Sequence, residues 1–161
     1  MDQPSNTSER RAFMTGSIAG LAGAAALAAG SAAASAVKRT GLDPDGAPAA
    51  DSGYTPGIKA EGGQTVVFVS GQGPEDYDAD METQMRQTFD RIGKVLAEAG
   101  AGFEHVVILR SYFVDIARDL PAYRKVRKEY LKQPYPASTA VGTPALAIPG
   151  LQFEIEAVAI L

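Results

Sequence analysis

Thr65-Val-Val-Phe-Val-Ser70 is a short, apolar and β-branched run that has glycines on both sides. Such a run is typical of a buried strand. The residues after it predict a helix with one apolar face, since apolar side chains recur every three or four positions at Met81, Met85, Phe89, Ile92, Leu96 and Ala99. Gly100 then stands where a helix needs a left-handed cap. A buried strand followed by an amphipathic helix indicates a domain that packs helices on a sheet.

The same succession continues to the C-terminus. A second strand is predicted for residues 105–115, and a second helix follows Asp119, which can cap it. The apolar stripe of this helix includes Val126, or Arg127 by its aliphatic stem. Extended segments are expected at residues 54–59, 138–143 and 152–161. The order predicts an α+β fold, ferredoxin-like, with two helices on one face of a mixed sheet. The other sheet face then needs a partner, and self-association supplies one.

Composition excludes several classes of site. The chain has 161 residues, a net charge of −4, one histidine and no cysteine. The acidic balance argues against nucleic acid as a partner. A lone histidine, His105, does not provide a metal site or a serine triad, so no metal is expected. No Walker motif or dinucleotide fingerprint is present, and we expect no cofactor.

The N-terminal part predicts export. Arg10-Arg11 is followed by Ala12 and Phe13, as in a twin-arginine motif, and an uncharged Ala/Gly/Ser-rich stretch ends at Ala34-Ser35-Ala36. We interpret residues 1–36 as a twin-arginine signal peptide; a retained membrane anchor is the alternative. Residues 37–52 are predicted to be a flexible linker and residues 53–161 the folded domain. The mature protein would then be periplasmic or extracellular, with no membrane contact after cleavage.

The last strand carries two carboxylates on one face. In residues 153–157, period-two alternation places Glu154 and Glu156 on one face and Phe153 and Ile155 on the other. A solvated sheet face is the ordinary explanation. However, the carboxylate face becomes apolar at Val158 and Ile160. This pattern suggests a wet cleft at the edge of a buried interface.

Several segments resemble the RidA/YjgF family. The matching residues are Gly57 to Ala60, Val67 to Gln72, Gln84 to Thr88, Val95 to Gly100, Tyr135 to Thr139 and Phe153 to Ala159. The resemblance covers about residues 53–161. It implies a chorismate-mutase-like fold, a homotrimer, and ligand clefts between subunits. In well-studied members these clefts hydrolyse imines and enamines to keto acids and ammonia, as 2-iminobutanoate/2-iminopropanoate deaminases do.

The resemblance also implies site residues. Tyr54, Ser70, Gly71 and Glu154 stand where the family lines its cleft, and Glu154 is the position proposed to orient or activate water. Deaminating members carry an arginine that clamps the substrate carboxylate, and Ser138 occupies that position here. This departure places the chain in an arginine-less branch.

Other residues near these positions complete the predicted site. Ser138 and Thr139 would hold the substrate through hydroxyl and backbone groups. Arg124 falls where the family often has asparagine, and either Arg110 or Arg124 could supply a relocated cation. Surface salt bridges are the simpler role for both arginines.

Two functions follow from these expectations. The first is a hydrolase of a small imine, enamine or related carbonyl compound, in which Glu154 positions water. The second is a non-catalytic homotrimer that binds a small metabolite and has lost the deaminase arginine. A ribonuclease or chaperone activity, sometimes attached to the family, is a third and weaker hypothesis because a basic stripe is absent.

Overall fold

The computed structural model describes residues 36–45, 49 and 51–161. The predicted signal peptide, residues 1–36, lies outside the described residues apart from Ala36. Within the described ranges, no helix combines the length and the apolar character that crossing a membrane would require.

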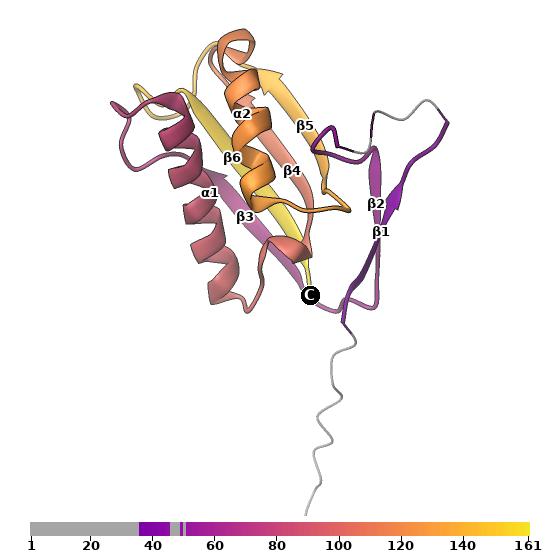
Figure 1. The fold of residues 1–161 in the computed structure, drawn as a ribbon. Coiled ribbons are helices and arrows are strands. Elements are labelled where there is room, and N and C mark those ends of the chain that lie inside the picture. The colour runs from indigo at the N-terminus through magenta and orange to yellow at the C-terminus, as the bar shows by residue number, and fades with distance from the viewer. Residues whose placement is uncertain (1–35, 46–48, 50) are drawn as a thin grey trace, which may run out of the picture. The chain divides into compact units, whose positions relative to one another are not determined.

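A four-stranded mixed sheet forms the centre of the fold (Figure 1). Its strand order is β3 (Val66–Gln72), β6 (Phe153–Ile160), β4 (Val106–Phe113) and β5 (Ala137–Gly142). β6 pairs antiparallel with both β3 and β4, whereas β4 and β5 are parallel. β6, the last strand of the chain, therefore lies inside the sheet, and β5 is an edge strand.

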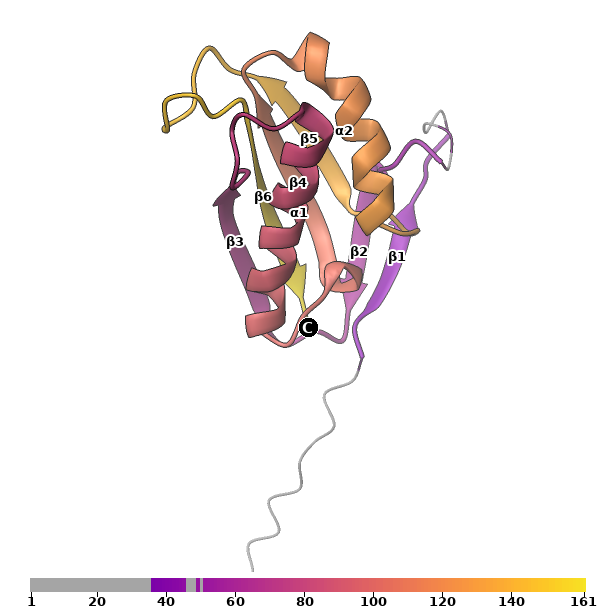
Figure 2. The same cartoon turned by 60° about the vertical axis from the view of Figure 1, so that its left-hand side comes forward.

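Both long helices, α1 (Met81–Glu98) and α2 (Ile116–Tyr130), cover the same face of this sheet (Figure 2). A short 3-10 helix, η1 (Phe103–His105), precedes β4. This arrangement confirms the predicted α+β fold with a mixed sheet and two helices on one face. The predicted apolar stripe of α1 is confirmed at Met85, Phe89, Ile92 and Leu96, which are fully buried, whereas Ala99 is exposed at the end of the helix. Gly100 has the expected positive φ, 71°.

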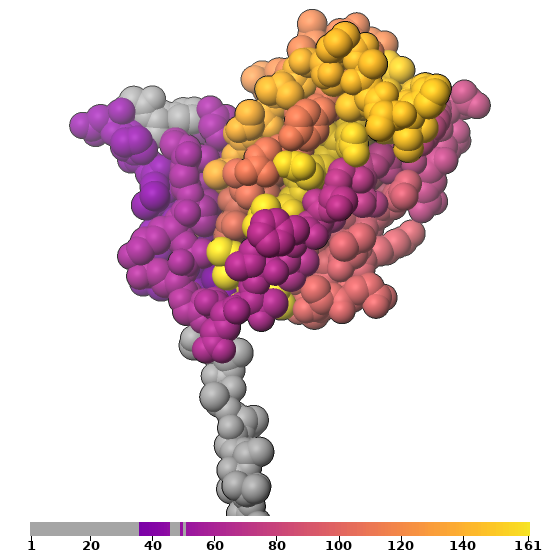
Figure 3. Space-filling model, turned by 180° about the vertical axis from the view of Figure 1, so that it is seen from behind, coloured from indigo at the N-terminus to yellow at the C-terminus, as the bar shows by residue number. Residues whose placement is uncertain are grey.

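The alternation predicted for the last strand is also confirmed. Phe153, Ile155, Ala157 and Ala159 of β6 are buried beneath the helices. The side chains between them belong to the face that no helix covers. Figure 3 shows this face, with β6 visible between its neighbouring strands. We call it the open face of the sheet. Phe68 of β3 also lies on it and is 77% exposed.

The predicted cap of α2 needs correction. The N-cap of α2 is Asp115, whose carboxylate accepts the backbone N–H of Arg118 at 3.0 Å. Asp119, which we expected to be the cap, lies within the helix and is buried against the Arg118 guanidinium at 2.6 Å. Because the helix begins at Ile116, Pro121 lies inside it.

Residues 37–52 do not form a linker throughout. Lys38–Leu42 forms β1, which pairs antiparallel with β2 (Gly57–Glu61) in a separate two-stranded sheet. The Arg39 guanidinium anchors β1 by donating to the backbone oxygens of Glu104 and, at 2.7 Å, Pro134. These partners are distant in sequence, so composition alone gave no sign of the strand.

Phe89 gives a direct test of the core. Its ring stacks on Tyr130 with centroids 4.9 Å apart and is fully buried between α1, α2 and the sheet. We expect Phe89→Ala to lower the free energy of unfolding by about 3–5 kcal/mol, because truncation leaves a cavity. Val95→Ala, on the exposed side of the same helix, is the matched control and should change it by less than about 0.5 kcal/mol. Equal effects in urea unfolding would contradict this packing.

Candidate functional site

A cavity of about 240 Å³ lies between α2 and the edge strand β5. We call it the α2–β5 pocket. It is lined by Ser52, Tyr54, Ile116, Leu120, Tyr123, Arg124, Arg127, Ser138 and Ala140. Three of the predicted site residues therefore share one pocket: Tyr54, Arg124 and Ser138.

Backbone pairing brings Tyr54 to β5. Its neighbour Thr55 forms a parallel bridge with Ala137 at the start of β5. The Thr55 hydroxyl also donates to the backbone oxygen of Tyr135 at 2.6 Å. Residues that are far apart in the chain, Tyr54 and Ser138, are thereby held on one wall of the pocket.

Arg127 is a charged residue of the pocket that the sequence did not identify as functional. Only 4% of its surface is exposed, and its Nε and Nη2 atoms have no hydrogen-bond partner among the described residues. Its guanidinium carbon lies 4.9 Å from the centroid of the Tyr123 ring. Burial lowers the pKa of the guanidinium. The aliphatic stem of Arg127 fits the apolar stripe of α2, and for that reason its charged end was overlooked.

The pocket opens towards further positive charge. Arg124 is exposed at the pocket, and it makes no ion pair in the described part of the chain. A neighbouring cavity of about 430 Å³ shares Ser52, Tyr54 and Arg124 with the α2–β5 pocket and adds Asp51 and Lys128. Three cations and one carboxylate thus line this region of an otherwise acidic protein.

Glu154 and Gly71 form a second group of predicted residues. A β-bulge between Val69 and Gln72 inserts an extra residue in β3, opposite β6. The bulge brings Gly71 against the Glu154 side chain, since a β-carbon on Gly71 would lie only 1.8 Å from Glu154 Oε1. The side-chain amide of Gln72 donates, through Nε2, to the backbone oxygens of both Ser70 and Gly71 at 3.1 Å. Glycine at position 71 therefore makes room for the carboxylate.

The two carboxylates of β6 have different surroundings. Glu156 accepts a hydrogen bond from Arg110 at 2.7 Å across the β4–β6 pair. The Glu154 carboxylate has no hydrogen bond or ion pair with any residue in the described ranges. Arg110 is thus paired on the open face and does not reach the α2–β5 pocket. Of the two arginines named as relocated cations, only Arg124 lines that pocket.

The sheet separates the two groups of predicted residues. Ser138 faces the α2–β5 pocket, whereas Thr139, the next residue, is paired in register with Arg110 and belongs to the open face. Ser70 and Glu154 also lie on the open face. A small ligand in the α2–β5 pocket of one protomer cannot contact Glu154 of that same protomer.

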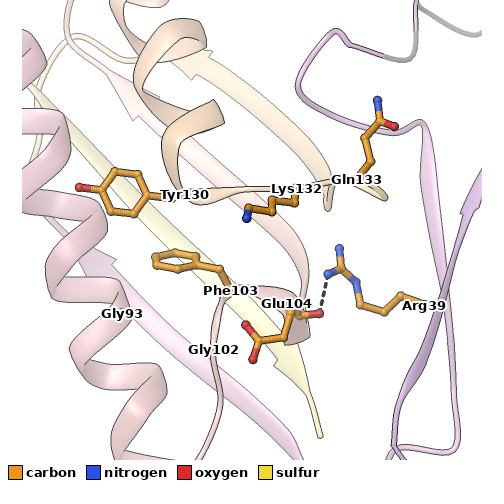
Figure 4. Close-up of a pocket in the computed structure, with 8 residues that line it drawn as sticks. All are labelled: Arg39, Gly93, Gly102, Phe103, Glu104, Tyr130, Lys132 and Gln133. Atoms are coloured by element: carbon orange, nitrogen blue, oxygen red, sulfur yellow. Dashed lines mark hydrogen bonds between the residues drawn. The ribbon is translucent and has the colours of Figure 1, made fainter.

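A further cavity of about 430 Å³ lies beside η1 and contains none of the predicted site residues (Figure 4). Arg39, Phe103, Tyr130 and Lys132 are among its lining residues. Its arginine already donates to two backbone oxygens, and the Phe103 and Tyr130 rings pack edge-on with centroids 5.6 Å apart. These contacts hold β1 and α2 in place. In the described ranges, no cluster of three or more His, Cys, Asp or Glu side chains could hold a metal ion.

Comparison with known proteins identifies the family. The sequence profile of the family described as Endoribonuclease L-PSP matches residues 45–161. The RutC family protein YjgH of Escherichia coli K12 is 32% identical over 130 residues, which cover 76% of this chain and 95% of that protein. Reactive Intermediate Deaminase A, chloroplastic, of Arabidopsis thaliana is 30% identical over 137 residues, or 81% of this chain and 71% of that protein.

A solved structure agrees with these matches. YyfB of Yersinia pestis, described as a protein of unknown function of the conserved Rid protein family, aligns with a TM-score of 0.68 at 27% identity. The alignment covers 76% of this chain and 98% of YyfB. The fold, the matched profile and the relatives lead to one conclusion: the chain belongs to the RidA/YjgF (Rid) family, also described as Endoribonuclease L-PSP.

Proposed function

We propose that this protein hydrolyses a small imine, enamine or related carbonyl compound at a site built between two copies of the chain. The main support is the Glu154 carboxylate, which lies against Gly71 and has no hydrogen bond or ion pair among the described residues. A carboxylate in that position can hold a water molecule and accept its proton. The relative named Reactive Intermediate Deaminase A supports the reaction class.

The proposed chemistry needs no group beyond the chain and water. The Glu154 carboxylate accepts a proton from the water whose oxygen bonds to the imine carbon. That proton passes on to the substrate nitrogen, which gives a carbinolamine. The carbinolamine hydroxyl then gives its proton, through the same carboxylate, to the amine as the carbon–nitrogen bond breaks, so that ammonia and a carbonyl product are released. The backbone and hydroxyl groups of Ser70–Gly71 and Ser138–Thr139 hold the substrate, and Ser138 does so from the α2–β5 pocket.

Association of copies supplies the missing half of the site. Phe68, Val66 and Val141 are large apolar side chains on β3 and β5 that are 77%, 51% and 40% exposed. Exposed apolar side chains on an uncovered sheet face are typical of an interface. We propose a homotrimer, as the resemblance implies, in which Glu154 of one protomer meets the α2–β5 pocket of the next.

One observation favours a second candidate, a non-catalytic trimer that binds a small metabolite. By the resemblance, Ser138 stands where deaminating members have arginine, and a hydroxyl donates a single neutral hydrogen bond. Such a protein would bind the same ligand class and leave it unchanged. The hydrolysis experiment below distinguishes the two functions.

We also propose that residues 1–36 direct export by the twin-arginine route, so that the protein acts in the periplasm or outside the cell. The support is the Arg10-Arg11 pair and the uncharged stretch that ends at Ala36. N-terminal sequencing of protein recovered from the periplasm or the medium should begin at Val37. Recovery only from the membrane, with the N-terminus retained, would favour the anchor instead.

The first activity experiment concerns Glu154. An amino-acid oxidase generates imines from a panel of amino acids, and hydrolysis by the added protein lowers trapping by semicarbazide. We expect the wild-type protein to accelerate hydrolysis and Glu154→Gln to slow it by about 10²–10⁴-fold, the usual share of a general base. Glu156→Gln is the matched control on the same strand, because that carboxylate is already paired with Arg110.

Gly71→Ala tests the same site without touching the carboxylate. The added β-carbon would overlap the Glu154 side chain and force it to move, so we expect a loss of rate close to that of Glu154→Gln. No acceleration by the wild-type protein on any imine would favour the binding function. Acceleration that survives in Glu154→Gln would show that the site is placed wrongly.

A further inference from the structure

The side chain of Arg127 is a buried positive charge without an ion-pair partner among the described residues. Arg127 is 4% exposed, and two of its guanidinium nitrogens have no hydrogen-bond partner among the described residues. Burying an unpaired charge costs free energy, and buried charges in proteins are normally paired. The ring of Tyr123 compensates only in part. Such a residue calls for an explanation, and a bound anion provides one.

No carboxylate of the same chain fills this role. The ion pairs within the described ranges include none with Arg127. Burial lowers the pKa of Arg127, and the positive charge of Arg124 on the same helix acts in the same direction, whereas Tyr123, Tyr135 and Tyr54 act in the opposite direction. Gly53, at φ 89°, lies over the Arg127 guanidinium: a β-carbon at this position would be 3.6 Å from Arg127 Nε. The pocket therefore concentrates positive charge.

The pocket has the size and lining for a small organic anion. Its volume, about 240 Å³, is below that of sites for drug-sized ligands. Ile116, Leu120 and Ala140 provide apolar walls, whereas Ser138 and Tyr54 provide hydroxyl groups. A carboxylate with a short aliphatic chain matches this combination of one cation, hydroxyl donors and apolar surface.

We propose that Arg127 is the anion-binding residue of the α2–β5 pocket and that the ligand is a small carboxylate. The cation is supplied from α2, the helix that faces Ser138 of β5 across the pocket. The ligand carboxylate accepts hydrogen bonds from the guanidinium and from the Ser138 hydroxyl. The inference deepens the proposed function and rests on it for the reaction. Binding of a carboxylate at Arg127 does not depend on that reaction.

The test measures binding and does not depend on turnover. The probe is 2-oxobutanoate, titrated calorimetrically into the purified protein, with butan-2-one as the uncharged comparison. Arg127→Met should weaken 2-oxobutanoate binding by about 30-fold, or about 2 kcal/mol, and leave any butan-2-one binding unchanged. Arg127→Lys should recover part of the affinity. Arg110→Gln removes a cation from the open face and should leave the affinity unchanged.

Thermal stability separates a binding role from a structural one. Because an unpaired buried charge opposes folding, Arg127→Met should keep or raise the Tm of the ligand-free protein. A role in holding the fold predicts a lower Tm with unchanged 2-oxobutanoate affinity, and that result would overturn the proposal. So would a wild-type protein that does not bind millimolar 2-oxobutanoate, or a neighbouring protomer whose carboxylate pairs with Arg127 in a ligand-free crystal structure.

The two proposals fail in different ways. If the wild type hydrolyses no imine but still binds 2-oxobutanoate through Arg127, the hydrolase is wrong and the anion site stands. If hydrolysis depends on Glu154 but Arg127→Met changes neither the hydrolysis rate nor the affinity for 2-oxobutanoate, the hydrolase stands and the anion site is wrong.

Discussion

The alternation of side chains along a β-strand is the constraint on which the account of the site depends. Ser138 and Thr139 are neighbours on the edge strand β5, so one faces α2 and the other faces the open side of the sheet. Glu154 lies on β6, on the open side. The residues that the resemblance gathers into one cleft are therefore divided between two faces in each protomer. A second copy, placed on the open face, is the simplest way to bring both groups to one ligand.

Positive charge distinguishes the α2–β5 pocket from the rest of the protein. A chain with a net charge of −4 concentrates Arg124, Arg127 and Lys128 around one pair of adjoining cavities. The other arginines described above are engaged: Arg39 holds β1, and Arg110 pairs with Glu156. Among the arginines of the described ranges, Arg127 alone is buried, and it lines the α2–β5 pocket. Serine at position 138, where the resemblance implies an arginine, thus does not by itself mean loss of anion recognition.

The fold was largely predictable because its signals are local. The period-two pattern of residues 153–160 and the helical stripe from Met81 to Leu96 each follow from a short window of sequence. β1 was not predictable in this way, since Arg39 anchors it through residues of η1 and the segment before β5. The cap of α2 was misplaced by one turn because Asp115 and Asp119 are both plausible caps in sequence. Arg127 was overlooked because a long aliphatic stem looks like core until its burial is known.

The most direct test of the central claim is a crystal structure of the assembled protein with 2-oxobutanoate. The account predicts that the ligand lies between two protomers, with its carboxylate at Arg127 and Ser138 of one chain and its carbonyl carbon facing Glu154 of the neighbour. A monomer, or an assembly in which Glu154 faces solvent far from any α2–β5 pocket, would contradict it.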